Sequence, residues 1–438
     1  MKRFIVTVIW IAVVGSMAMA QPESGSVLTL SQCRTLALEN NKQIAASRQA
    51  TSSAVYTARS AYGNFLPDIS ASGAGMYNSK EGTIDMLGYG IDYEIGTLYS
   101  VGLTIEQPVY MGGKISAGYK MAKLGQAIAE KQETLTATEV VEATDCAYAG
   151  VVRATEMIRV AGAYNEMLNS LLTTVESAYR NGMKPKNDVL KVQVKVDESI
   201  LALRRAENAL RLARMNLCHY IGLPLDSMVS VSEDFTQATD VSLISSPLPA
   251  IAAIENRPEF SMLSSQVDLA KQEIKLNRSE LLPKVGVSAS YNYVHGIEIG
   301  NRTLLDDGIF TAMVSVSLPL FHFGERSNKV RAAKAKMLQA ELDREEGIES
   351  MTLELTQAAN NVDEASLELT IAERSLTQAE ENMRVSRSMY DAGMETLADH
   401  LEAQALWQQA WQTRVDAAYS LYLAHVAYQK ASGTLLAE

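Results

Sequence analysis

The stretch from residue 351 to residue 390 decides the fold: MTLELTQAANNVDEASLELTIAERSLTQAEENMRVSRSMY. Apolar and small side chains recur in and just before it at alternating steps of three and four residues, with no proline. This heptad spacing is typical of a long helix packed against another helix. Its positions are Ile348, Met351, Leu355, Ala358, Val362, Ala365, Leu369, Ala372, Leu376, Ala379, Met383, Ser386 and Tyr390.

The helix expected from this pattern is unusually long. It runs from Glu325 to Asp391, and the same seam earlier in the chain predicts a second helix from Lys114 to Arg180. At about 1.5 Å per residue each would measure on the order of 100 Å, a length that suits a rod crossing the periplasm rather than a globular domain. Gly182 or Gly393 follows each helix, and another helical pattern comes next, so we expect two helical hairpins.

The sequence contains an internal duplication. Landmark residues recur 216 positions apart before the long helices and 211 positions apart after Pro108, so one connection is five residues shorter in the second half. We therefore expect a first repeat over 21–222, a linker over 223–249 and a second repeat over 250–438. The landmark pairs are Ala37–Asn40 with Ala253–Asn256, Leu66-Pro67 with Leu282-Pro283, Pro108 with Pro319, Tyr179 with Tyr390, Asp188 with Asp399, and Gly222 with Gly433.

Period-two alternation in each repeat predicts a pair of strands. It is clear in Val285–Tyr293 and Phe310–Leu318, with the glycines and aspartates between them expected to form a loop. We expect strand pairs over 68–108 and 284–319, each preceded by a shorter helix and followed by a helical hairpin, over 114–222 and 325–433. Aromatic residues at the strand ends suit a membrane interface, and the alternative is the core of a soluble sandwich.

Four strands from one chain leave two open sheet edges. Each unpaired backbone group costs several kcal/mol in hydrocarbon, so a membrane-embedded sheet must close with strands from other chains. Two chains would give eight strands and a filled barrel, whereas three would give twelve strands and room for a lumen. The number of chains stays open on this argument alone.

The first twenty residues resemble an export signal. Lys2 and Arg3 precede an apolar run from Phe4 to Val14, and Ala18-Met19-Ala20 forms an A-x-A cleavage site. This order predicts a secretory signal peptide over 1–20. The alternative is an uncleaved N-terminal anchor.

Composition excludes several classes of function. The chain has 39 Lys and Arg against 51 Asp and Glu, which disfavours nucleic acid as a partner. Three cysteines cannot form a disulfide scaffold, and we expect free thiols on packed helices. The five histidines lack metal-ligand spacing, and His400 is expected at the surface of a hairpin turn. Nucleotide-binding and hydrolase motifs are absent from the sequence, so we expect no cofactor, no metal site and no enzyme.

Several of these motifs resemble those of one family. Gln107-Pro108-Val109-Tyr110-Met111-Gly112-Gly113 is similar to the strand-to-helix corner of the outer-membrane efflux (TolC-like) family. Leu66-Pro67 and Leu282-Pro283 resemble its helix-to-strand corners, and the segments Tyr179–Asp188 and Tyr390–Asp399 resemble its helical tips. The similarity covers both repeats.

The resemblance implies an α+β membrane protein that assembles as a homotrimer. A twelve-stranded β-barrel in the outer membrane would continue as an α-helical barrel in the periplasm. It also implies passive conduction, with the helical tips docked to a periplasmic adaptor protein that is served by an inner-membrane pump of RND or ABC type. The competing interpretations are a periplasmic adaptor and a coiled-coil structural protein of the envelope.

The resemblance also assigns roles to residues at the tips. Asp399 and Glu402 match positions that ring the aperture with carboxylates, and Asp188 and Tyr390 match a gate that holds the tips closed. Six turn residues match the adaptor-docking tips: Asn181, Gly182, Met183, Ala392, Gly393 and Met394. The alternatives are simple helix caps and a solvated helix face.

One position at the tip departs from the family pattern. Glu395 stands where that pattern has a basic gate residue, so an arginine–carboxylate latch is not expected there. Lys184 or Lys186 would be the substitute.

Overall fold

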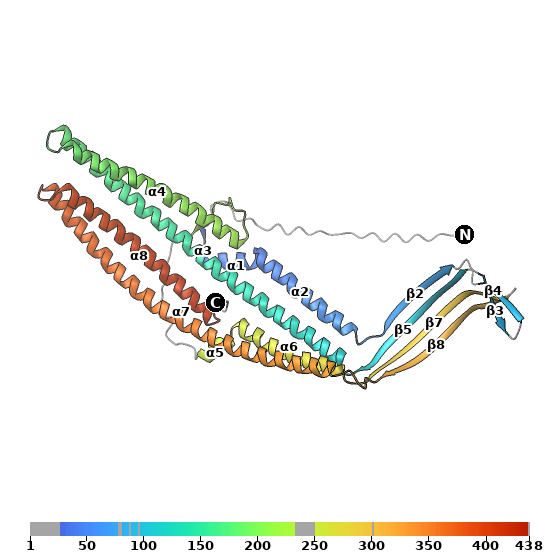
Figure 1. The fold of residues 1–438 in the computed structure, drawn as a ribbon. Helices are drawn as coiled ribbons and strands as arrows, with labels where there is room; N and C mark the ends of the chain where they lie inside the picture. The colour runs from blue at the N-terminus through green and yellow to red at the C-terminus, as the bar shows by residue number, and fades with distance from the viewer. Residues whose placement is uncertain are drawn as a thin grey trace, which may run out of the picture.

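The computed structural model describes residues 27–77, 81–86, 89–94, 97–232, 250–299 and 302–436. The expected signal peptide and residues 233–249 of the expected linker lie outside the described residues. The molecule is elongated, with a sheet at one end, two helical turns at the other end and a helical body between them (Figure 1).

The helices of the two halves follow the same order. A short helix and a 22-residue helix precede the strands, and a 67-residue helix followed by one of 35 or 36 residues comes after them. This order confirms the duplicated unit. The helices are α1 (Leu30–Asn40), α2 (Lys42–Gly63), α3 (Lys114–Arg180) and α4 (Lys186–Ile221), then α5 (Ala250–Glu255), α6 (Pro258–Ser279), α7 (Glu325–Asp391) and α8 (Leu397–Ala431).

Local sequence explains where the helices begin. The Asn41 side chain caps α2 by accepting hydrogen bonds from the backbone N–H groups of Gln43, at 2.8 Å, and Ile44, at 3.4 Å. Each long helix starts after a glycine with positive φ, Gly113 at 87° or Gly324 at 86°. This left-handed conformation is easily adopted by glycine, and it redirects the chain from the strand into the helix.

The sheet is built from two long antiparallel hairpins that lie side by side. Its main order is β2 (Asp68–Tyr77), β5 (Thr97–Met111), β7 (Lys284–Ile299) and β8 (Arg302–Ser317), with β5 and β7 paired across the repeats. Two further strands, β3 (Glu81–Met86) and β4 (Tyr89–Glu94), continue the first hairpin, and β4 also pairs with β7. A separate parallel pair joins β1 (Val27–Leu28) to β6 (Ser230–Val231).

The prediction of a loop between the second pair of strands is wrong. Strands β7 and β8 stay paired along most of it, from Val294 with Asp307 to Ile299 with Arg302. The pairing shifts register beside Gly296, whose φ is 124°. A bulge at this glycine therefore absorbs the irregular residues that resemble a loop in the sequence. The strands reach farther from the helices than the alternation alone predicts.

Neither face of the large sheet is covered by the rest of the described chain. All of β2 is exposed, and so are large apolar side chains of the other strands, among them Val101, Phe310 and Val316. A soluble sandwich needs a second sheet packed over the first. In the described part of the chain the only other sheet is the two-stranded pair β1–β6, so the structure does not support the sandwich alternative.

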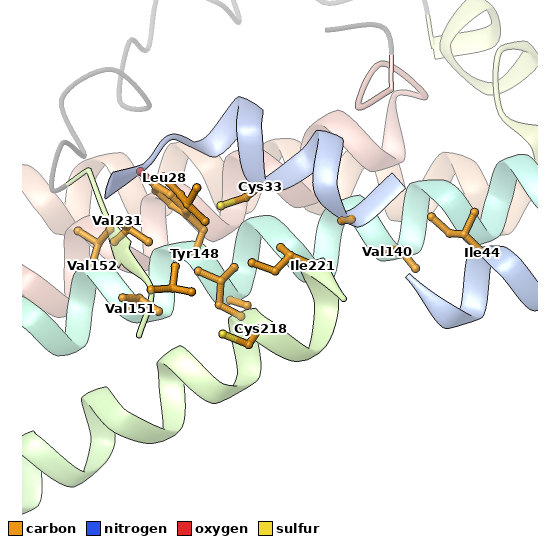
Figure 2. Close-up of a cluster of buried hydrophobic side chains, with 14 residues drawn as sticks. Leu28, Cys33, Ile44, Val140, Tyr148, Val151, Val152, Cys218, Ile221 and Val231 are labelled. Atoms are coloured by element: carbon orange, nitrogen blue, oxygen red, sulfur yellow. The ribbon is translucent and has the colours of Figure 1, made fainter. Parts of the chain in front are cut away.

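The buried core lies among the helices. One cluster fills the junction of α1, α3 and the end of α4, where Tyr148, Ile221 and Val231 converge (Figure 2). Cys33 and Cys218 belong to this cluster as buried free thiols, and burial raises the pKa of Cys33 to about 12. A second cluster joins the two hairpins near their turns, through Leu168 of α3, Val192 of α4 and Trp407 of α8, among others.

The helices differ in length and in apolar character. Among the described residues, none of them combines the length and the apolar character needed to cross a bilayer.

Candidate functional site at the helical tips

Both hairpins turn through the same backbone motif. After α3, the N–H of Gly182 donates to the carbonyl of Tyr179 at 2.9 Å, and the N–H of Met183 donates to that of Ala178 at 2.9 Å. After α7, Gly393 and Met394 repeat the pattern at 3.0 and 2.9 Å. This pair of bonds is the Schellman motif, which satisfies the last carbonyls of a helix.

The turns present small and flexible side chains to solvent. Gly182 and Gly393 both have a φ of 73°, and a Cβ added to either would meet nothing within 4 Å. Met183 and Met394 are the exposed residues that follow. All six residues expected to form the docking tips are exposed at the end of the molecule opposite the sheet (Figure 1). The two turns therefore do cap the helices, and they also present a surface that is accessible to solvent.

Tyr390, one of the two expected gate residues, is buried at the end of α7. Only 9% of its surface is exposed, whereas its repeat equivalent Tyr179 is 43% exposed. Burial raises the pKa of Tyr390, and the carboxylates of Asp188 and Asp391 raise it further. Asp188 lies half-buried in the first turn of α4, and within the described residues no hydrogen bond joins its side chain to Tyr390.

A lysine from the other hairpin contacts this tyrosine. The Nζ of Lys184, in the turn between α3 and α4, lies 5.0 Å from the centre of the Tyr390 ring. That distance is within the range of a cation–π interaction. Lys184 is one of the two lysines suggested as a substitute for the missing basic residue. The turn of the first hairpin is thus tied to the end of the second long helix.

His400 stacks on Tyr390, and the sequence-based placement of this histidine was wrong. Expected at the surface, it is 4% exposed, with its ring 4.9 Å from that of Tyr390 and tilted by 6°. Its Nδ1 lies 3.1 Å from the Ser386 hydroxyl, and its Nε2 lies 2.9 Å from the Gln404 amide nitrogen.

One signal in the sequence could have revealed this polar pocket. Positions 211 residues before Ser386 and His400 carry Val175 and Val189, which are buried and apolar. A serine and a histidine replacing two buried valines in a repeated unit point to an altered interior rather than a surface. The expectation of a surface residue rested on the neighbouring Asp399 and missed this correspondence.

The proposed aperture residues lie on the exposed side of α8. Asp399 and Glu402 are three positions apart and are both exposed, so they share one helical face. The carboxylate of Asp399 accepts a hydrogen bond from the Thr396 hydroxyl at 2.6 Å, while that hydroxyl caps the backbone N–H of Asp399 at 3.3 Å. Asp399 therefore also stabilises the start of α8, and a negative charge is favourable at that end of a helix.

Glu395 lies in the turn between α7 and α8, at the position where the family pattern has a basic residue. Its Oε2 is buried and has no hydrogen-bond partner among the described residues. Its charge favours protonation of His400, although burial dominates and lowers the pKa of that imidazole. Lys184 stands at the equivalent position of the first turn, so the two turns carry opposite charges.

The side chains of the site supply charge and aromatic contacts. In the part of the chain that the structure describes, no three His, Cys, Asp or Glu side chains gather as metal ligands. The arrangement can hold two helical hairpins together and present carboxylates to solvent, which are structural and electrostatic tasks.

Known proteins resemble the chain along most of its length. The family model "Outer membrane efflux protein" matches residues 34–223 and 251–434. Outer membrane protein TolC of Vibrio cholerae serotype O1 is 23% identical over 415 residues, covering 93% of this chain and 91% of TolC. Alkaline protease secretion protein AprF of Pseudomonas aeruginosa is 23% identical, covering 70% of this chain and 63% of AprF.

Solved structures share the fold. The outer membrane protein VceC of Vibrio cholerae superposes with a TM-score of 0.76 at 17% identity, covering 92% of this chain and 96% of VceC. The two stretches matched by the family model correspond to the two repeats, and that family consists of transport proteins rather than enzymes. The chain therefore belongs to the outer membrane efflux protein family, which confirms the outer-membrane export channel expected from its duplication, corners and tip turns.

Proposed function

We propose that three copies of this chain form the exit duct of an envelope-spanning export system. Three sheets would close into a twelve-stranded barrel in the outer membrane, and three sets of hairpins would form a helical barrel in the periplasm. The duct conducts passively, because its sequence carries no nucleotide-binding motif. An inner-membrane pump of RND or ABC type supplies the driving force through a periplasmic adaptor.

The observation that carries the proposal is the open sheet. One chain supplies a sheet whose faces are both uncovered, and among the described residues β2 pairs only with β5 and β8 only with β7, which leaves one side of each strand open. Such a sheet is not stable alone in hydrocarbon, since its unpaired backbone groups lack partners. Joining β8 of one copy to β2 of the next removes every such edge. Three copies are the smallest ring that leaves a lumen.

Helix α7 supports the same assembly from the periplasmic side. Its heptad seam packs within the chain, with Val362 and Ala372 buried, but the opposite face carries a second apolar row. Successive members of that row are 4, 11, 14, 4, 14 and 4 residues apart, which keeps them within about 60° on a helix of 3.6 residues per turn. This stripe consists of the exposed residues Leu338, Leu342, Leu353, Leu367, Ile371, Val385 and Met389.

A helix that is apolar on two opposite faces needs two neighbours. Within the chain α7 packs against α5, α6 and α8. The position equivalent to Leu367 is Glu156 in α3, which is charged. We assign the stripe of α7 to the contact with an adjacent copy in the ring.

The tips supply the gate and the docking surface. Lys184 and Tyr390 join the two hairpin turns of one chain, and release of that contact would let α7 and α8 move outward. Asp399 and Glu402 of three copies would place six carboxylates around the aperture and favour cations. The exposed turns at Met183 and Met394 are the surface offered to the adaptor.

The proposal is tested by a substitution in the stripe of α7. We expect Leu367→Glu to abolish the trimer, because it places three buried carboxylates at the contacts between copies. Leu367→Met keeps the apolar contact and should leave the trimer intact. Mass photometry of detergent-solubilised protein gives the oligomeric state, and planar bilayers give conductance. A wild-type protein that is monomeric and does not conduct would overturn the proposal, as would a Leu367→Glu protein that remains trimeric.

A further inference from the structure

His400 is the buried centre of a polar pocket in an otherwise apolar helix interface. Ser386 and Gln404, its two hydrogen-bonding neighbours, are buried as well. Nε2 faces the Gln404 amide nitrogen at 2.9 Å and Nδ1 faces the Ser386 hydroxyl at 3.1 Å, so we assign Nε2 as the acceptor and Nδ1 as the protonated nitrogen. This geometry suits a neutral imidazole, which has one donor nitrogen and one acceptor nitrogen.

The pocket fixes the orientation of the gate tyrosine. The His400 ring is parallel to the Tyr390 ring within 6°, and Tyr390 in turn lies 5.0 Å from the Lys184 ammonium of the other hairpin. The first hairpin has no such arrangement, because Val175 and Val189 stand at the positions of Ser386 and His400, and Tyr179 is largely exposed. Burial of the tyrosine and presence of the histidine therefore occur together in one repeat and are both absent from the other.

We infer that His400 is a positioning residue of the closed tip, which holds Tyr390 against Lys184 while the imidazole is neutral and releases it when the imidazole is protonated. The inference rests on the tip acting as the gate in the proposed function. Protonation adds a second donor on Nε2, so the ring can no longer accept from the Gln404 amide N–H, and the amide must rotate to bring its unpaired Oε1 toward the ring. Protonation also places a full charge in a buried site, which is unfavourable without a partner.

Charged groups on several packed elements act on His400. Glu395 in the turn and Asp391 at the end of α7 favour the protonated ring, whereas Arg387 of α7 disfavours it. Lys184 and Asp188, from the other hairpin, lie near Tyr390. Burial outweighs the carboxylates, and the net effect lowers the pKa of His400 in the closed tip.

The sign of the pH effect follows from that lowered pKa. In an opened tip the exposed imidazole returns toward its ordinary pKa of about 6.5. The opened tip then binds the proton more tightly than the closed tip, so acid favours opening. The closed state has its full stability above about pH 6.5 and loses it as the pH falls through the lowered pKa. Each pKa unit between the two states is worth about tenfold in the closed-to-open ratio.

The experiment compares three trimers in planar bilayers at pH 7.5 and pH 5.5. Both pH values lie above the ordinary pKa of an aspartate or glutamate side chain, which is about 4. The wild type is compared with His400→Gln and with a double variant, Ser386→Val and His400→Val, that copies the first hairpin. We expect the open probability of the wild type to rise several-fold on acidification, up to about tenfold per pKa unit. Both variants should lose that rise and still conduct.

A gate variant keeps this inference separate from the proposed function. Tyr390→Ala should be open at both pH values, because it removes the contact with Lys184. If Tyr390→Ala opens the channel but the His400 variants keep the wild-type pH response, or if the wild type shows no response, the role of His400 is refuted. If Tyr390→Ala has the same low open probability as the wild type, the tip is not the gate and that part of the proposed function fails.

Discussion

The two helical hairpins have the same plan but different surroundings. Helices α3 and α7 both span 67 residues, yet 18 residues of α3 are buried against eight of α7. Helix α3 packs against α1, α2, α4, α6 and α8, whereas α7 packs against α5, α6 and α8. The first hairpin is therefore the centre of the chain's own core, and the second has an apolar face that the described part of the chain leaves exposed. Duplication preserved the helix length and let the burial diverge.

The sharpest test of this difference is the buried carboxylate of α3, which has no counterpart among the buried residues of α7 that the structure describes. Asp145 is fully buried, and its two oxygens accept hydrogen bonds from Arg34 of α1 at 3.0 and 2.8 Å. Asp145→Ala removes both hydrogen bonds and the charge that neutralises Arg34, a side chain that is only 20% exposed. We expect Asp145→Ala to lower the free energy of unfolding by about 3–5 kcal/mol. Urea denaturation followed by circular dichroism measures the change.

The matched control uses the equivalent position of the second repeat. Thr356 of α7 is exposed and donates a hydrogen bond to the carbonyl of Thr352 within its own helix at 2.8 Å. Thr356→Ala should change stability by no more than about 0.5 kcal/mol. Replacing both partners by apolar residues, Arg34→Met with Asp145→Leu, should restore much of the loss. Equal effects of Asp145→Ala and Thr356→Ala would show that the two long helices contribute alike.

A smaller difference is expected at the glycines that end α4 and α8. Gly222 and Gly433 have φ values of 74° and 72°, so alanine costs about 1–2 kcal/mol at either position. A Cβ at Gly222 would also lie 2.6 Å from the Cβ of Asn40, whereas at Gly433 the nearest atom, on Asn256, is 3.3 Å away. Gly222→Ala should be the more destabilising by about 1–3 kcal/mol, because its surroundings are overpacked.

An asparagine separates the two causes. Asparagine tolerates the left-handed conformation but still carries a Cβ. Gly433→Asn should therefore be close to the wild type in the same denaturation assay, while Gly222→Asn should remain destabilised. If Gly222→Ala and Gly433→Ala were equally stable, the crowding at Gly222 would be refuted.

The smallest expected change concerns charge at the tips and leaves stability intact. Asp399 and Glu402 of the second hairpin correspond to Asp188 and Lys191 of the first. The second hairpin thus carries two carboxylates where the first has one carboxylate and one cation. We expect Asp399→Ala with Glu402→Ala to lower the cation selectivity of the bilayer conductance several-fold, since fixed charges at a constriction select ions.

The control for this test removes the same charge elsewhere. Glu364 and Glu368 are exposed near the middle of α7, and Glu364→Ala with Glu368→Ala should change selectivity much less. Reversal potentials in a salt gradient give the ratio of cation to anion permeability. Unchanged selectivity in the Asp399 and Glu402 variant would assign these residues to helix capping and solvation alone.

Much of the fold could be predicted because its signals are periodic. The heptad seam ending at Tyr390 predicts the long helices, and the pairs 211 and 216 residues apart predict the duplication. The extent of β7 and β8 could not be predicted, because Gly296 and Asp306 resemble loop residues until the pairing across the hairpin is known. Backbone hydrogen bonds that depend on a distant partner leave little trace in local composition.

The tip shows the same limit at the level of single residues. The exposed turns at Gly182 and Gly393 follow from local sequence, because a glycine that ends a helix adopts a positive φ. The burial of His400 does not follow from local sequence, since it depends on how α7, α8 and the turn of the other hairpin pack together. Comparison of the halves, valine against histidine at equivalent positions, was the available clue.

The equal length of α3 and α7 has a consequence for how such a duct can change in evolution. In a ring that alternates the two hairpins, both must reach the same height for their turns to meet. Shortening one helix alone would leave a step at the mouth. Deletions are therefore expected in matched pairs and in whole heptads, so that each seam keeps its facing side. The two repeats therefore constrain each other, because shortening one long helix requires shortening the other by the same amount.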